Sequence, residues 1–114
     1  MTLTQVFEDA VKKFPSHLAI KGEGFSYTYS SFEIATRQFA GQLISLGILP
    51  GENVGICLDR SAEMLVGVFG ILRSGAAYLP IDASHPRQRV LTIMADANVK
   101  NVVTTQNSYP IFTL

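Results

Sequence analysis

The chain has 114 residues, of which 47% are hydrophobic and 16% are charged. This length suits one domain, and this composition excludes a disordered chain, which needs low hydrophobicity and excess charge. Nine basic and nine acidic residues give a formal net charge of zero, so nothing indicates a nucleic-acid partner bound through its phosphates. The single cysteine, Cys57, excludes an internal disulfide framework and is compatible with a reducing compartment.

No segment indicates export or insertion into a membrane. The apolar run from Met64 to Leu72 is bounded by Glu63 and Arg73, and it is far shorter than the roughly 20 residues of a spanning helix. The N-terminus has neither the basic start nor the apolar core of a signal peptide. We therefore expect a cytoplasmic protein without a membrane partner.

The N-terminal third predicts a helix followed by a hairpin. Apolar residues recur with helical spacing up to Pro15, which lacks an amide donor and ends the helix: Leu3, Val6, Phe7, Ala10, Val11 and Phe14. Residues 18–21 and 25–29 predict two short strands, and the glycines in residues 22–24 suit the turn between them.

A second helix is predicted to follow the hairpin directly. Ser30 and Glu33 have the spacing of a capping box at its start, and Gly47 suits its end. Its expected buried face consists of five apolar residues: Phe32, Ala35, Phe39, Leu43 and Leu46.

The central part of the chain alternates strands and helices. Strands are predicted at residues 54–58, 76–81 and 102–105, with helices at 62–73 and from a Ser84 cap to residue 97. The helix at 62–73 is apolar nearly all round, so we expect it to be deeply buried, with close packing at Gly67 and Gly70 and a stop at Gly75. In the last helix, Pro86 occupies the first turn.

These elements predict one α/β domain over residues 1–114. Helices of this length can cross over a sheet, which implies parallel strands. The expected fold is an open, mainly parallel sheet with crossover helices, preceded by a helix, a β-hairpin and a second helix.

Glycine spacing does not indicate a phosphate loop. Gly70 and Gly75 have the spacing of a P-loop, but Ala76 and Ala77 follow where Lys and Ser or Thr are needed, and the order is helix to strand. The pair in residues 22–24 lacks the third glycine of a dinucleotide-binding turn. We interpret the segment from Gly70 to Gly75 as the end of a helix and the glycines of residues 22–24 as part of a hairpin turn.

Two carboxylates follow predicted parallel strands. Asp59 and Asp82 would lie at the sheet edge where ligands bind, and such a pair could hold magnesium or act as acid and base. No nucleophile or base completes a catalytic set, so the preferred interpretation is that both cap turns or helix starts.

The remaining polar candidates indicate no site. His17 and His85 lie in loops without a second ligand at metal-binding spacing, and Cys57 lies in an apolar strand as a small core residue. Arg87 and Arg89 suit a solvated helix start better than a phosphate clamp. We expect no catalytic, cofactor-binding or metal-binding residue in this chain.

One string is specific for a known family. Residues 72–82, Leu-Arg-Ser-Gly-Ala-Ala-Tyr-Leu-Pro-Ile-Asp, resemble the second core motif of adenylate-forming enzymes, most closely that of the amino-acid adenylation domains of nonribosomal peptide synthetases. Arg73 replaces the usual Lys, and Ser74 the usual Ala. Residues 58–66, 82–86 and Arg89 are also similar to that family. Residues 27–32 resemble its first core motif, with Ser31 in place of Glu.

The resemblance extends over about Leu3 to Gln106 and implies an N-terminal fragment of such a domain. Complete members use ATP and magnesium to convert a carboxylic acid into an acyl-adenylate and pyrophosphate, and commonly pass it to a phosphopantetheine thiol. Their phosphate loop, acid pocket, nucleotide-binding residues and catalytic lysine would all follow Leu114. The implied chain is inactive alone and binds no cofactor by itself.

Several alternatives remain open from the sequence. The chain could be one part of a split adenylating enzyme, with the remainder of the domain as its partner. It could instead be a stand-alone α/β interaction module that self-associates, as its zero net charge and apolar composition favour. A third alternative is an unrelated small nucleotide-binding protein.

Overall fold

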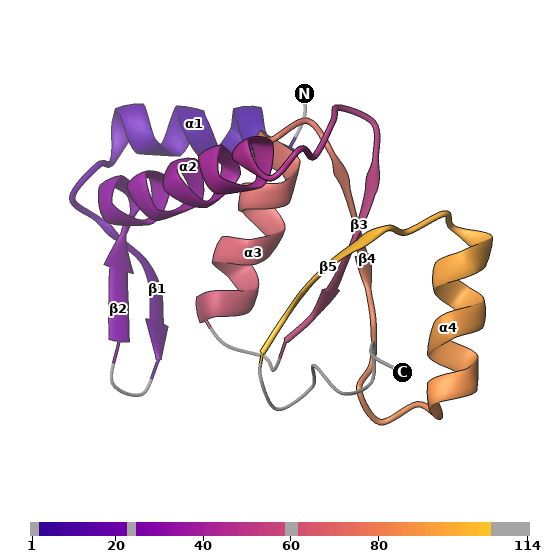
Figure 1. Cartoon of the computed structure of the whole chain (residues 1–114). Coiled ribbons are helices and arrows are strands. Elements are labelled where there is room, and N and C mark those ends of the chain that lie inside the picture. Colours follow the sequence, from indigo (N-terminus) through magenta and orange to yellow (C-terminus); the bar gives the residue numbers. More distant parts are fainter. Residues whose placement is uncertain (1–2, 23–24, 59–61, 106–114) are drawn as a thin grey trace.

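The computed structural model describes residues 3–22, 25–58 and 62–105. Nine helices and strands occupy this part of the chain (Figure 1). In chain order they are α1 (Leu3–Lys13), β1 (Leu18–Gly22), β2 (Phe25–Thr28), α2 (Tyr29–Ser45), β3 (Asn53–Cys57), α3 (Ala62–Arg73), β4 (Ala77–Pro80), α4 (Arg87–Asp96) and β5 (Asn101–Thr104).

The strands form two separate sheets. Strands β1 and β2 make an antiparallel hairpin, and β3, β4 and β5 make a parallel sheet in the order β4-β3-β5. In the central register, Ile56 of β3 lies opposite Pro80 of β4 and Val103 of β5. The expected α/β fold with a parallel sheet is therefore confirmed.

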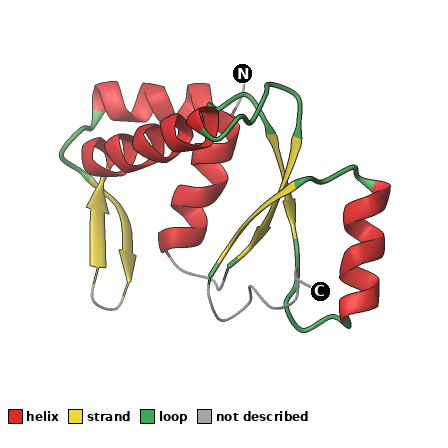
Figure 2. Cartoon of the chain, in the orientation of Figure 1, coloured by secondary structure: helices red, strands yellow, loops and turns green. Residues whose placement is uncertain are grey.

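Helices cover both faces of the parallel sheet (Figure 2). On one face, α2 and α3 pack on Val54 and Ile56, which are 0% and 1% exposed. On the other face, Val90 of α4 packs with Cys57 and Ile81. Strand β3 is buried on both sides because its successive side chains point to opposite faces.

A third packed group joins the N-terminal elements to α3. The rings of Phe7, Phe32 and Phe69 come from α1, α2 and α3, and their centroids lie 5.2–5.5 Å apart. Tyr27 of β2 adds an edge-on contact to Phe32 at 5.8 Å. Tilted aromatic contacts of this kind add to the free energy of apolar burial, so they hold the hairpin and α1 to the rest of the fold.

Two predicted helix starts are wrong. The capping box of α2 consists of Thr28 and Ser31, because the helix begins directly at the end of β2. Helix α4 follows Pro86 and has no side-chain cap, since the Ser84 hydroxyl donates to Asp82 instead. The predicted stop at Gly75 is confirmed: its φ of +92° is a left-handed conformation that glycine adopts without strain.

Several side chains expected to be buried are exposed. Val6 and Phe14 of α1 are 50% and 47% exposed, and Leu46 after α2 is 80% exposed. Helix α3 is only partly buried, since Leu65 is 40% exposed. Each of these residues has the right spacing, but the packing of the described residues leaves it partly uncovered. Within the same part, no helix combines the length and apolar character that a membrane crossing requires.

Three helical glycines allow a direct test of close packing. A Cβ at Gly70 would lie 2.5 Å from Cδ2 of Phe39 and 3.2 Å from its Cβ, whereas a Cβ at Gly41 would meet no atom within 4 Å. Both substitutions to Ala gain helix propensity. We expect Gly41→Ala to raise the free energy of unfolding by about 0.5–1 kcal/mol.

In contrast, Gly70→Ala should lower the free energy of unfolding by about 1–2 kcal/mol, because α3 must move away from Phe39. Urea denaturation of the two variants measures the difference. Gly67→Ala should fall between them, since the nearest atom to its Cβ would be the flexible tip of Ile56, at 2.8 Å. Equal effects at Gly41 and Gly70 would contradict the close approach of α2 and α3.

Candidate functional site

The carboxyl ends of β3 and β4 open into a hollow of about 690 Å³. Loops at this edge of an open α/β sheet are where ligands commonly bind. The hollow lies between the end of the sheet, the start of α3 and one face of α4. It is lined by Cys57, Leu58, Met64, Pro80, Ile81, Asp82, Ala83, Ser84, His85, Val90 and Ile93.

The floor of this hollow is apolar because it belongs to the core between β3 and α4. Cys57 is 2% exposed and packs with Ile81 and Val90. Its backbone carbonyl accepts a hydrogen bond of 3.0 Å from the Thr104 hydroxyl, which ties β3 to β5. Cys57 is thus the small core residue that the sequence predicts.

The rim of the hollow is polar and is organised by Asp82. One oxygen of this carboxylate accepts hydrogen bonds from the Ser84 hydroxyl at 2.7 Å and from the Ser84 N–H at 2.9 Å. The other oxygen lies 3.8 Å from Nε2 of His85. The hydroxyl bond first, and then the N–H bond, lower the pKa of Asp82 below its ordinary value, with a smaller contribution from His85.

These bonds make Asp82 a turn-forming residue. An Asp that bonds the backbone two residues further on closes the loop after its strand, as the preferred sequence interpretation predicts. In this arrangement the Ser84 hydroxyl donates to the carboxylate of Asp82 and fixes the turn. Across residues 3–22, 25–58 and 62–105, no three His, Cys, Asp or Glu side chains gather as metal ligands would.

The other predicted candidates do not come together at this edge. Asp59 lies outside the described residues, so its pairing with Asp82 stays a prediction. His17 is exposed and stacks on Phe14 with centroids 5.0 Å apart, near the hairpin. Arg87 and Arg89 are exposed at the start of α4. The segment from Gly70 to Gly75 is the end of α3, not a loop that could hold a phosphate.

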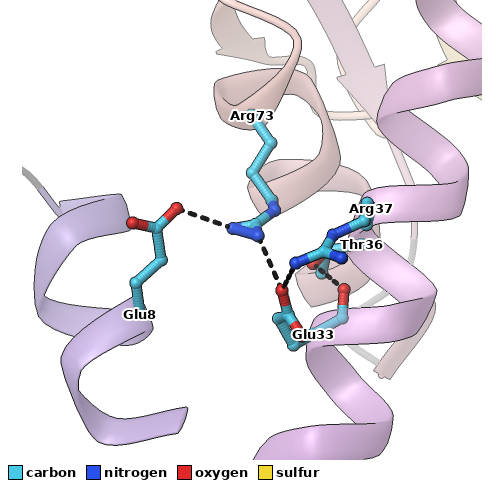
Figure 3. A network of polar contacts seen from close by, with 5 residues as sticks. All are labelled: Glu8, Glu33, Thr36, Arg37 and Arg73. Atoms are coloured by element: carbon cyan, nitrogen blue, oxygen red, sulfur yellow. Dashed lines mark hydrogen bonds and ion pairs between the residues drawn. The ribbon is translucent and has the colours of Figure 1, made fainter. Parts of the chain in front are cut away.

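Sequence reasoning missed a charged network at the C-terminal end of α3 (Figure 3). Arg73, at the end of α3, contacts Glu8 of α1 at 3.3 Å and Glu33 of α2 at 3.0 Å. Glu33 also forms an ion pair with Arg37 one turn along α2. The side chains of Arg73 and Glu33 are only 11% and 15% exposed, so this network joins three helices in a partly buried place.

Only one link of this network could be found from sequence. Glu33 and Arg37 have the i, i+4 spacing of a helical ion pair. Arg73 is separated from Glu33 by 40 positions, and no local pattern relates them. The same pairing explains why Glu33 does not cap α2 as predicted: its carboxylate points toward α3.

The sequence matches one family model over most of its length. The model, described as AMP-binding enzyme, matches residues 7–112. The chain is 40% identical over 103 residues to gramicidin S synthase 2 of Brevibacillus brevis, which is 90% of this chain and 2% of that protein. It is 39% identical over 102 residues to bacitracin synthase 2 of Bacillus licheniformis, 90% of this chain and 4% of the relative. The chain thus spans a small part of these relatives.

Solved structures share this fold. The nonribosomal peptide synthetase FmoA3 matches with a TM-score of 0.87 and 30% identity, over 96% of this chain and 12% of FmoA3. The N-terminal subdomain of Klebsiella oxytoca NpsA matches with a TM-score of 0.85 over 91% of this chain and 27% of the subdomain chain. At 18% identity, this second likeness shows the fold alone.

The geometry at the rim predicts how Asp82 titrates. Ser84 lowers the pKa of Asp82. The ionised carboxylate of Asp82 therefore stabilises the folded state above about pH 4, and this contribution is lost as the pH falls through the lowered pKa. We expect Ser84→Ala to raise the pKa of Asp82, as followed by NMR of the carboxyl carbon. His85→Ala is the control and should change it less; the reverse order would contradict the assigned cause.

The charged network predicts unequal costs for two glutamates. Glu33→Gln removes the charge shared by two arginines in a partly buried place, and should lower the free energy of unfolding by about 1–3 kcal/mol. Glu8 is 52% exposed, so Glu8→Gln should cost less than about 1 kcal/mol. Urea denaturation measures both.

A double-mutant cycle separates the pair of Glu33 and Arg73 from other effects. In an Arg73→Met background, Glu33→Gln should lose a large part of its cost, because the pair is already broken. Additive costs would show that the two side chains do not interact.

Proposed function

The chain belongs to the family of AMP-binding enzymes, and from this membership we propose that it is the N-terminal part of an adenylation domain that activates an amino acid for nonribosomal peptide synthesis. The observation that carries the proposal is the family match over residues 7–112. The named relatives are synthases of gramicidin S and bacitracin. Membership in this family excludes the unrelated nucleotide-binding protein among the alternatives.

In the proposed reaction, the carboxylate of an amino acid attacks the α-phosphorus of ATP, which forms an aminoacyl-adenylate and releases pyrophosphate. In this proposal, residues 3–22, 25–58 and 62–105 contribute to the reaction as part of the structural framework of the domain. Residues 72–82 form the end of α3, the turn at Gly75, strand β4 and the turn at Asp82. Ser74, Ala76 and Ile81 of this stretch are buried, and no buried polar side-chain atom is left unsatisfied among the described residues.

We further propose that the reaction requires polypeptide beyond these 114 residues. The sequence contains no glycine-rich loop followed by Lys and Ser or Thr, which is the usual way to hold a triphosphate through backbone amides. ATP and magnesium would therefore bind to the completed domain and not to this chain alone. A cytoplasmic location, where ATP is available and the thiol of Cys57 stays reduced, fits this proposal.

Pyrophosphate exchange tests the proposal in two proteins. The 114-residue chain should show no exchange above the blank with ATP, magnesium and any of the twenty amino acids. A chimera of FmoA3, in which residues 3–105 of this chain replace the matching segment, should show exchange that depends on α-methyl-L-serine, since FmoA3 has been solved with that aminoacyl-adenylate bound.

Unmodified FmoA3 serves as the positive control for this assay. Exchange by the chain alone would contradict the scaffold role, because it would require a phosphate site within these residues. A folded but inactive chimera would contradict the proposal that this segment is interchangeable with the N-terminal part of an adenylation domain.

A further inference from the structure

One face of α2 stays largely exposed in the packing of the described residues. Ile34 and Ile44 lie on this face and are 52% and 56% exposed, and Arg37 and Gly41 between them are exposed as well. The buried residues of the helix lie on a different face: Phe32, Thr36, Ala40 and Leu43. The four exposed residues are separated by three, four and three positions, which is the spacing of the contact face in paired helices.

The order of residues on this face suits pairing with a second copy of the same helix. About a two-fold axis, residue i contacts residue j and residue j contacts residue i. If two α2 helices pack antiparallel with the axis midway between Arg37 and Gly41, Ile34 lies opposite Ile44 of the second copy, and Arg37 lies opposite Gly41. A parallel pair would instead place Arg37 against Arg37, and like charges in contact are unfavourable.

The surface beside Gly41 has room for an arginine side chain. A Cβ at Gly41 would meet no atom within 4 Å. A hollow of about 480 Å³ adjoins this point, and its lining includes Glu8 of α1 together with Arg37, Gly41 and Ile44 of α2. Glu8 is 52% exposed. An arginine that reached over Gly41 from a second copy would therefore meet a carboxylate.

The charges of the hollow allow this exchange of partners. Figure 3 shows Glu8 and Arg37 on either side of Arg73, from α1 and α2. Arg37 is 70% exposed and pairs with Glu33, which also accepts a hydrogen bond of 3.0 Å from Arg73. Glu33 thus keeps a partner when Arg37 turns toward a second copy. An exposed guanidinium and an exposed carboxylate on the same surface make it complementary to itself.

We propose that the chain forms a two-fold symmetric dimer through the face of α2 that consists of Ile34, Arg37, Gly41 and Ile44. Ile34 packs on Ile44 of the second copy, and Arg37 lies over Gly41 and pairs with Glu8 of the second copy. This inference goes beyond the proposed function, because the face lies outside the motif of residues 72–82 and serves association, not adenylation.

The dimer is expected to be weak. Stable specific interfaces bury about 800 Å² per partner, and this face covers only about three turns of one helix. We expect a dissociation constant of about 10–100 μM, which corresponds to a small interface. Sedimentation equilibrium of the 114-residue chain over a series of concentrations measures it.

Two substitutions of exposed residues test the antiparallel register. Ile34→Glu and Ile44→Lys should each raise the dissociation constant about tenfold, because each places a charge in both apolar contacts. The double variant should associate at least about threefold more tightly than either single variant, since each glutamate then faces a lysine of the second copy. The two positions are about 15 Å apart along one helix, so they do not pair within one chain.

Three further measurements serve as controls. Leu91→Glu is the matched control, because Leu91 is 37% exposed on α4, which packs on the other face of the sheet; it should leave the dissociation constant unchanged. Glu8→Gln should raise the dissociation constant about threefold, through the loss of two ion pairs. The Tm of the Ile34 and Ile44 variants at low concentration should stay within a few degrees of the unmodified chain, since both residues are exposed.

The inference is overturned if the chain sediments as a monomer up to about 1 mM. A dimer that neither single substitution weakens would also overturn it, because a different surface would then hold the two copies. A double variant that associates no more tightly than the single variants would contradict the antiparallel register. Pyrophosphate exchange does not enter these measurements, so their outcome is independent of the proposed function.

Discussion

The close approach of α3 to its neighbours is the constraint on which the rest of this structure depends. Gly70 brings α3 so near to α2 that a single added carbon would overlap Phe39, and Gly67 brings it against Ile56 of the sheet. Glycine in the middle of a helix is unfavourable by about 1 kcal/mol relative to alanine. The gain is that the backbone of α3 lies directly against the side chains of Phe39 and Ile56, which packs this helix closely on both α2 and the parallel sheet.

Helix α3 therefore carries interactions in three directions. Its inner face buries Ile71 in the core with Val54 and Ile56. Phe69 points to the aromatic group that holds α1 and the hairpin. At its end, Arg73 binds carboxylates of α1 and α2. The motif that begins at residue 72 starts from this helix end and continues through the turn at Gly75 into strand β4.

At the carboxyl edge of the sheet, too, the described side chains have structural roles. Asp82 is in the position where many α/β enzymes place a functional carboxylate, yet its hydrogen bonds go to Ser84, two residues further on. The hollow behind it is floored by core residues such as Cys57 and Val90. In the described part of the chain, these residues therefore close a turn and form part of the core.

Local sequence determined which segments are helices and strands, because the period of apolar residues and the breaks at residues such as Pro15 and Gly75 act within one or two turns. It also determined the family, through residues 72–82. Tertiary structure alone decided the ion pair of Glu33 with Arg73, the shift of the α2 cap to Thr28, and the exposure of Leu46. These features depend on which distant segment lies beside a side chain, and the spacing of neighbouring residues does not contain that information.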